Sequence, residues 1–131
     1  MNDSSENDRA QAAADLIHYQ YGELLFDEGE FSRAVEQFVA VTKTPQANSA
    51  LVSRAHLRQG QALDAMNQRP AALEQYQIVL ARENVFDLHN LALRYTKRPY
   101  APEKAPRKNE ERGVPTASSG LSSITIRAKS G

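Results

Sequence analysis

The chain has three histidines, and a histidine side chain can bind a metal ion or transfer a proton. His18 and His56 lie 38 residues apart, and Glu23 or Asp64 could complete a metal or acid–base site with them. His89 has no such partner at a suitable spacing. The simpler interpretation is that His18 and His56 pack within helical hairpins, with the polar tip of each ring near water.

Other kinds of catalytic chemistry lack the residues that they need. The chain has no cysteine, which excludes disulfides, thiolate metal sites and a cysteine nucleophile. No glycine is followed by Lys-Ser or Lys-Thr, as a phosphate-binding loop requires. The sequence therefore predicts no catalytic residue, no metal site and no cofactor, and we expect a protein that is not an enzyme.

Apolar residues recur at steps of three and four along most of the chain, which predicts helices. The expected helices span residues 9–28, 31–43, 48–66, 70–82 and 86–97. Gly29 is expected to end the first helix, Asn48 or Ser49 to cap the third, and Pro70 to stand in the first turn of the fourth. No segment has the pattern of a strand ladder, so the expected fold class is all-α.

Composition divides the chain into three parts. Residues 1–8 are polar and acidic and are expected to be disordered, residues 9–98 form a helical domain, and residues 99–131 form a disordered basic tail rich in Pro and Ser. The LSSITIR segment at 121–127 could add as a strand to a partner, although a chance pair of isoleucines explains it as well. No signal peptide and no apolar run of membrane-spanning length is present, so we expect a cytoplasmic protein without membrane contact.

The two central hairpins repeat the same residues. Shifting the sequence by 38 positions gives seven identities in the 25 positions from 18 to 42, where chance would give about one or two. Gly22 aligns with Gly60, and Ala34 aligns with Ala72. Small residues at these positions would let the two helices of a hairpin approach closely, so we expect Gly22 to face Ala34 and Gly60 to face Ala72.

These residues resemble the tetratricopeptide repeat (TPR). The likeness consists of a small residue on the first helix, a bulky residue three positions later (Leu25 or Leu63), Gly29 in the first turn, and Ala34 on the second helix. The spacing of 38 residues departs from the usual 34, and Asn67 replaces glycine in the second turn. The resemblance implies a short TPR-like solenoid of two helical hairpins plus a C-terminal capping helix.

In proteins that resemble this one, the first helices of successive repeats line a concave groove. Here that groove would present five partner-binding residues: Tyr19, Glu23, Arg54, Arg58 and Gln61. Arg54 and Arg58 lie one turn apart and could hold an acidic or carboxylate-bearing partner, while Tyr19 supplies apolar contact. The clamp that some family members use for a terminal carboxylate is not expected, because Glu23 stands where that clamp needs asparagine.

The sequence favours a protein-interaction adaptor or scaffold module that binds a peptide or protein subunit through its helical groove. Two repeats and a cap are close to the smallest array that can bury a shared core, so self-association into a homo-oligomer is a further expectation. The alternative is a nucleic-acid or ribonucleoprotein accessory protein, because residues 97–108 are rich in Lys and Arg and include Tyr100, which could stack on a base. The neutral net charge argues against this alternative, since such proteins are usually basic.

Overall fold

The computed structural model describes residues 2–43 and 48–102. In these two ranges the chain forms helices and no strand, as predicted for the all-α class. The helices are α1 (Asn2–Asp27), α2 (Phe31–Thr42), α3 (Ser49–Ala65), α4 (Arg69–Ala81) and α5 (Leu88–Lys97). None of these helices is both long and apolar enough to span a membrane.

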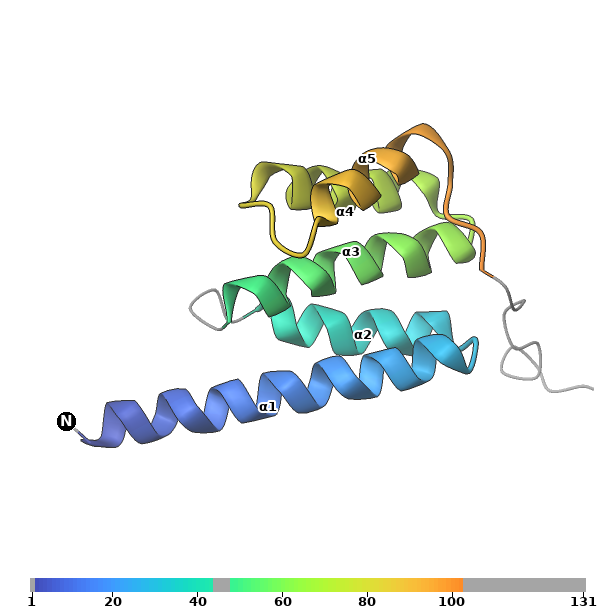
Figure 1. Cartoon of the computed structure of the whole chain (residues 1–131). Helices are drawn as coiled ribbons and strands as arrows, with labels where there is room; N and C mark the ends of the chain where they lie inside the picture. Colours follow the sequence, from blue (N-terminus) through green and yellow to red (C-terminus); the bar gives the residue numbers. More distant parts are fainter. Residues whose placement is uncertain (1, 44–47, 103–131) are drawn as a thin grey trace, which may run out of the picture.

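Consecutive helices pack against one another in a stack (Figure 1). α1 and α2 form one hairpin, α3 and α4 form a second, and α2 also packs against α3. α5 turns back against α4 and contacts α3. This packing is consistent with a helical repeat-like arrangement. Because α1 also contacts α3, the first helices of the two hairpins can form a shared surface.

The two hairpin turns have the same backbone geometry although their residues differ. Gly29 has a φ of 82°, and the N–H of the next residue donates to the carbonyl of Leu25 at 2.8 Å. Asn67 occupies the equivalent place with a φ of 62°, and the N–H of the next residue donates to the carbonyl of Leu63 at 2.9 Å. Asparagine tolerates the left-handed conformation better than most residues, so the second turn ends its helix in the same way.

The small residues of the repeat allow close packing, but their partners differ from the expected ones. A Cβ atom on Gly22 would lie 2.7 Å from Cε1 of Phe38, and one on Gly60 would lie 2.8 Å from Cδ1 of Tyr76. Both rings are fully buried. The atoms closest to each glycine therefore belong to an aromatic ring of the second helix rather than to the expected alanine. The sequence spacing correctly indicated that the helices come close at the two glycines. The directions of the Phe38 and Tyr76 side chains determine that an aromatic ring fills each contact.

The folded region extends further at both ends than predicted. α1 begins at Asn2, so residues 2–8 are helical rather than disordered. Because no Gly or Pro occurs before Gly22, nothing interrupts the growth of this helix from its packed part. At the other end Tyr100, assigned to the tail, packs against Phe26 and Tyr95 with ring centroids 5.8 and 5.4 Å apart. Residues 103–131, including the LSSITIR segment, lie outside the described residues.

Candidate functional site

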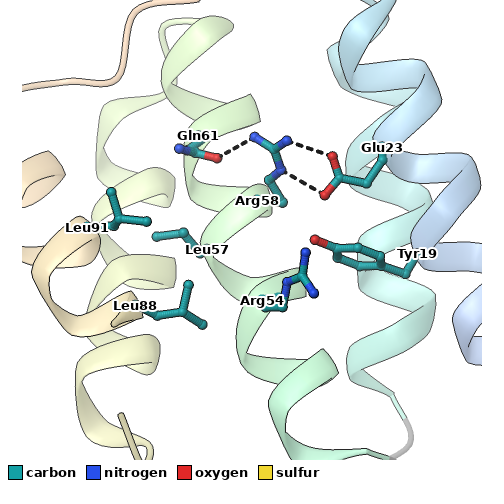
Figure 2. Close-up of a pocket in the computed structure, with 8 residues that line it drawn as sticks. All are labelled: Tyr19, Glu23, Arg54, Leu57, Arg58, Gln61, Leu88 and Leu91. Carbon is teal, nitrogen blue, oxygen red and sulfur yellow. Dashed lines mark hydrogen bonds and ion pairs between the residues drawn. The ribbon is translucent and has the colours of Figure 1, made fainter. Parts of the chain in front are cut away.

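The five residues predicted to bind a partner line one pocket with a volume of about 200 Å³. Tyr19 and Glu23 come from α1, whereas Arg54, Arg58 and Gln61 come from α3. Figure 2 shows these side chains pointing toward one another across the gap between the two helices. Each helix contributes residues three or four positions apart, which lie on one helical face. The apolar part of the lining consists of Leu57, Leu88 and Leu91.

Arg58 is committed to contacts within the protein. Its Nε donates to Oε2 of Glu23 at 3.0 Å and its Nη2 donates to Oε1 of Glu23 at 2.6 Å, while Nη1 donates to Gln61 at 2.9 Å. The guanidinium also lies 4.3 Å from the centroid of the Phe26 ring. Such a two-pronged arginine–carboxylate pair ties α3 to α1. Arg58 therefore shapes the wall of the pocket, and it is not the free cation that the sequence suggested.

The contacts with Arg58 also change the pKa of the Glu23 carboxyl group. Burial acts to raise the pKa of Glu23, but the hydrogen bonds from Arg58 and Tyr19 and the charge of Arg58 outweigh it, so the pKa falls below its usual value. Burial acts to lower the pKa of Arg58, and Glu23 more than offsets this effect. Both side chains are thus charged at neutral pH, and their charges neutralise each other inside the pocket.

Arg54 has a different environment from Arg58, although one helical turn separates them. Its guanidinium lies 5.1 Å from the centroid of the Tyr19 ring and 5.3 Å from that of Phe86. Among the described residues, Arg54 forms neither an ion pair nor a hydrogen bond through its side chain, and it is exposed. The two aromatic rings hold the cation in place by cation–π contact. Its N–H donors therefore face solvent at the edge of the pocket.

Tyr19 forms the wall of the pocket beside Arg54. It is 6% exposed, and its ring packs on Phe38 with centroids 5.6 Å apart. Burial and its hydrogen bond to Glu23 raise the pKa of Tyr19 to about 12. The hydroxyl is therefore protonated at neutral pH, so its role here is to pack and to donate a hydrogen bond rather than to exchange a proton.

Sequence reasoning missed the contribution of α5 and of the turn before it. Leu88 and Leu91 line the pocket because α5 folds back onto α3; their spacing suggested a helix but not its position. Phe86 is 67% exposed, and both Phe86 and Asp87 have positive φ, at 52° and 59°. α5 consequently begins at Leu88 and not at residue 86. A positive φ is uncommon for a large side chain. At Phe86 this backbone conformation occurs together with the contact between the Phe86 ring and Arg54.

The histidines connect the two helices of each hairpin. Nδ1 of His18 donates to Oε1 of Gln37 at 2.8 Å, and Nδ1 of His56 donates to Oε1 of Gln75 at the same distance. All four residues belong to the identities of the 38-residue repeat. His89 instead contacts the backbone carbonyl of Arg82 through Nε2 at 2.7 Å. Within residues 2–43 and 48–102 no group of three or more His, Cys, Asp or Glu side chains is placed to hold a metal ion.

The buried carboxylate of Asp64 joins the C-terminal segment to the helices. Asp64 accepts hydrogen bonds from Nη1 of Arg69, from the hydroxyl of Tyr76 at 2.7 Å and from the N–H of Tyr100 at 3.0 Å. At the equivalent positions the first hairpin has Phe26 and Phe38, which are both apolar. The second hairpin thus has a polar contact at two positions that are apolar in the first hairpin, and this contact also binds the chain after α5.

Comparison with known proteins found no matching family model, curated protein or solved structure.

Proposed function

We propose that this protein is an interaction adaptor that binds a peptide or protein partner in the pocket between α1, α3 and α5. The observation that carries the proposal is the pairing of an exposed arginine with an apolar lining: Arg54 stands at the pocket edge and forms no ion pair among the described residues, next to Leu57, Leu88 and Leu91. A partner that brings its own carboxylate and an apolar side chain would satisfy both parts.

The size of the pocket favours a side chain over a cofactor. Its volume of about 200 Å³ is below the roughly 300–1,000 Å³ that is usual for small-molecule sites. An aliphatic side chain of a peptide can enter a pocket of this size and contact Leu57 and Leu88. A neighbouring acidic residue can then reach Arg54, whose N–H groups make charge-assisted hydrogen bonds to carboxylates.

The fixed positions of Glu23 and Arg58 in the pocket wall also favour peptide binding. Glu23 and Arg58 neutralise each other and keep their places through two hydrogen bonds, so the remaining charge of the pocket is that of Arg54. A rigid pocket loses little conformational freedom on binding, which improves affinity. The expected ligand is therefore a peptide segment with Leu or Ile beside Asp or Glu.

Short synthetic peptides that vary the apolar residue and its acidic neighbour test this proposal directly. Immobilised peptides identify the tightest sequence, and fluorescence anisotropy then measures its affinity for the wild-type protein and for Arg54→Gln. Loss of a charge-assisted hydrogen bond should weaken binding by about tenfold or more. Arg9→Gln is the matched control, because Arg9 is exposed on α1 and does not line the pocket.

Two results would count against the proposal. Equal affinity of the wild-type protein and Arg54→Gln for every peptide would show that the pocket is not the binding site. Tight binding to single-stranded RNA that weakens steeply with salt would favour the nucleic-acid alternative. That alternative requires a stacking role for Tyr100, whose ring already packs against Phe26 and Tyr95.

A further inference from the structure

The charges of the pocket come from three of the residues that line it. Glu23 on α1 is the acid, and Arg54 and Arg58 on α3 are the bases. One negative and two positive charges leave a net charge of +1. Without Glu23 the same pocket would carry a second positive charge, on two guanidinium groups one helical turn apart. Glu23 therefore sets the net charge that a ligand meets (Figure 2).

Glu23 is held in one place and in its charged form. Arg58 donates to both of its carboxylate oxygens, at 2.6 and 3.0 Å, and each of the two side chains is only 26% exposed. These contacts outweigh the effect of burial and keep the pKa of Glu23 below its usual value. The negative charge is thus a fixed part of the pocket at neutral pH.

The charge of Glu23 also acts on any acid that binds at Arg54. The positive charge of Arg54 contributes to the low pKa of Glu23, so the two side chains interact electrostatically although no ion pair joins them. An acid held by Arg54 is then repelled by Glu23, and the repulsion grows with the charge of that acid. A carboxylate carries one negative charge, whereas a phosphorylated side chain carries about 1.5–2 at pH 7.

Phosphate recognition also needs donors that this pocket does not offer. Sites for phosphorylated side chains usually contain a cluster of arginines. Here Nε and Nη2 of Arg58 donate to Glu23, and Nη1 donates to Gln61, so Arg54 is the arginine of the pocket that remains for a ligand. A doubly charged group also loses more hydration energy than a singly charged one when it enters a partly apolar pocket. The one available arginine therefore matches the single charge of a carboxylate.

We propose that Glu23 is a specificity-determining residue, which makes the pocket select a carboxylate over a phosphorylated side chain. The inference rests on the proposed peptide-binding function and defines the acid that the peptide must carry. Asp or Glu beside the apolar residue makes a ligand, and phosphoserine at that position is a poorer one. Glu23 achieves this selection by occupying Arg58 and by repelling the second charge of a phosphate.

Three variants of the full chain test the role of Glu23. Glu23→Gln removes the negative charge but keeps an oxygen that can accept hydrogen bonds from Arg58 and Tyr19. Leu91→Lys raises the net charge of the pocket by the same amount without changing Glu23 or Arg58, so it carries the test if Glu23→Gln does not fold. Glu36→Gln is the matched control, because it removes an exposed acid on α2 that does not line the pocket. Circular dichroism verifies the fold of each variant.

Two peptides that differ at a single position give the first measurement. One has Leu beside Asp and the other has Leu beside phosphoserine, and fluorescence anisotropy near neutral pH gives both dissociation constants. The wild-type protein and Glu36→Gln should bind the Asp peptide more tightly. An additional charge near a carboxylate in a partly buried site changes affinity by roughly tenfold or more. In Glu23→Gln and Leu91→Lys the preference should therefore move toward phosphoserine by at least this factor.

Small anions separate this inference from the proposed function. The side-chain N–H signal of Arg54 is followed by NMR in the isotope-labelled protein during titration with acetate and with inorganic phosphate. In the wild-type protein acetate should shift this signal at a lower concentration than phosphate does. The preference should move toward phosphate in Glu23→Gln and stay unchanged in Glu36→Gln. Because this measurement needs no peptide, it reports the anion preference even when neither peptide binds.

The possible outcomes differ for the two proposals. If neither peptide binds but the preference for acetate depends on Glu23, the proposed function is overturned and the role of Glu23 is supported. If the wild-type protein binds phosphoserine as tightly as Asp, the role of Glu23 is overturned while peptide binding stands. A preference that Glu23→Gln and Leu91→Lys leave unchanged overturns that role as well. An Arg54 signal that neither anion shifts would show that the pocket binds no acid and would overturn both proposals.

Discussion

Replacing Asp64 by asparagine should be one of the most damaging single changes in the protein. The side chain of Asp64 is 1% exposed, and its two oxygens face donors alone: the Arg69 guanidinium, the Tyr76 hydroxyl and the backbone N–H of Tyr100. Asparagine keeps the shape but has a single acceptor oxygen and two N–H donors. At least one buried donor is then left without a partner, and Arg69 loses its counter-charge.

The size of the effect follows from these contacts. Removing one partner of a buried ion pair costs about 3–5 kcal/mol. Arg69 is 28% exposed at its side chain, so water can recover part of this loss, whereas the Tyr76 hydroxyl is buried. We expect Asp64→Asn to reduce the free energy of unfolding by about 2–4 kcal/mol. For a domain of this size that corresponds to a fall in Tm of roughly 10–30 °C.

Urea and thermal unfolding, followed by far-ultraviolet circular dichroism, measure this change. Asp8→Asn is the control, because Asp8 is exposed on α1 and its replacement should alter stability by less than about 0.5 kcal/mol. Tyr76→Phe reproduces the Phe38 of the first hairpin and should cost about 1 kcal/mol, since it removes one hydrogen bond. An Asp64→Asn protein as stable as Asp8→Asn would refute the argument that this carboxylate holds the helices and the C-terminal segment together.

Three further outcomes are expected. Gly60→Ala should lower stability by about 1–3 kcal/mol, because its Cβ would collide with the Tyr76 ring; the stabilisation usual for Gly→Ala in a helix would contradict this packing. Burial lowers the pKa of His56 although its hydrogen bond opposes the shift, so the unfolded state takes up a proton first and stability should fall as pH drops below 6.5. His56→Gln should flatten that part of the curve, and an unchanged slope would assign the effect to other groups. A chain that ends after residue 98 should melt at a lower temperature than one that ends after residue 102, because Tyr100 contacts Asp64 and Phe26; equal melting temperatures would show that these contacts add no stability.

Local patterns in the sequence were sufficient to predict the helices and their pairing. Helix periodicity, the turn at Gly29 and the cap at Asn48 depend on residues close together in the chain, and the N–H of Leu51 does donate to the Asn48 side chain at 3.1 Å. The 38-residue repeat also placed Tyr19 and Arg54 on the first helices of neighbouring hairpins, which predicted a shared surface. These predictions succeed because backbone hydrogen bonding and helical spacing are short-range properties.

Only the tertiary structure decided what each of those residues does. Arg54 and Arg58 lie one helical turn apart on α3, and the sequence predicted the same role for both. In the structure Arg58 pairs with the Glu23 carboxylate of α1, whereas Arg54 contacts the rings of Tyr19 and Phe86. The leucines of α5 complete the pocket because α5 folds back, and the segment at Tyr100 is held because Asp64 replaces the apolar residue of the first hairpin. The physical reason is that these contacts join residues far apart in the chain, whose geometry depends on the mutual placement of whole helices.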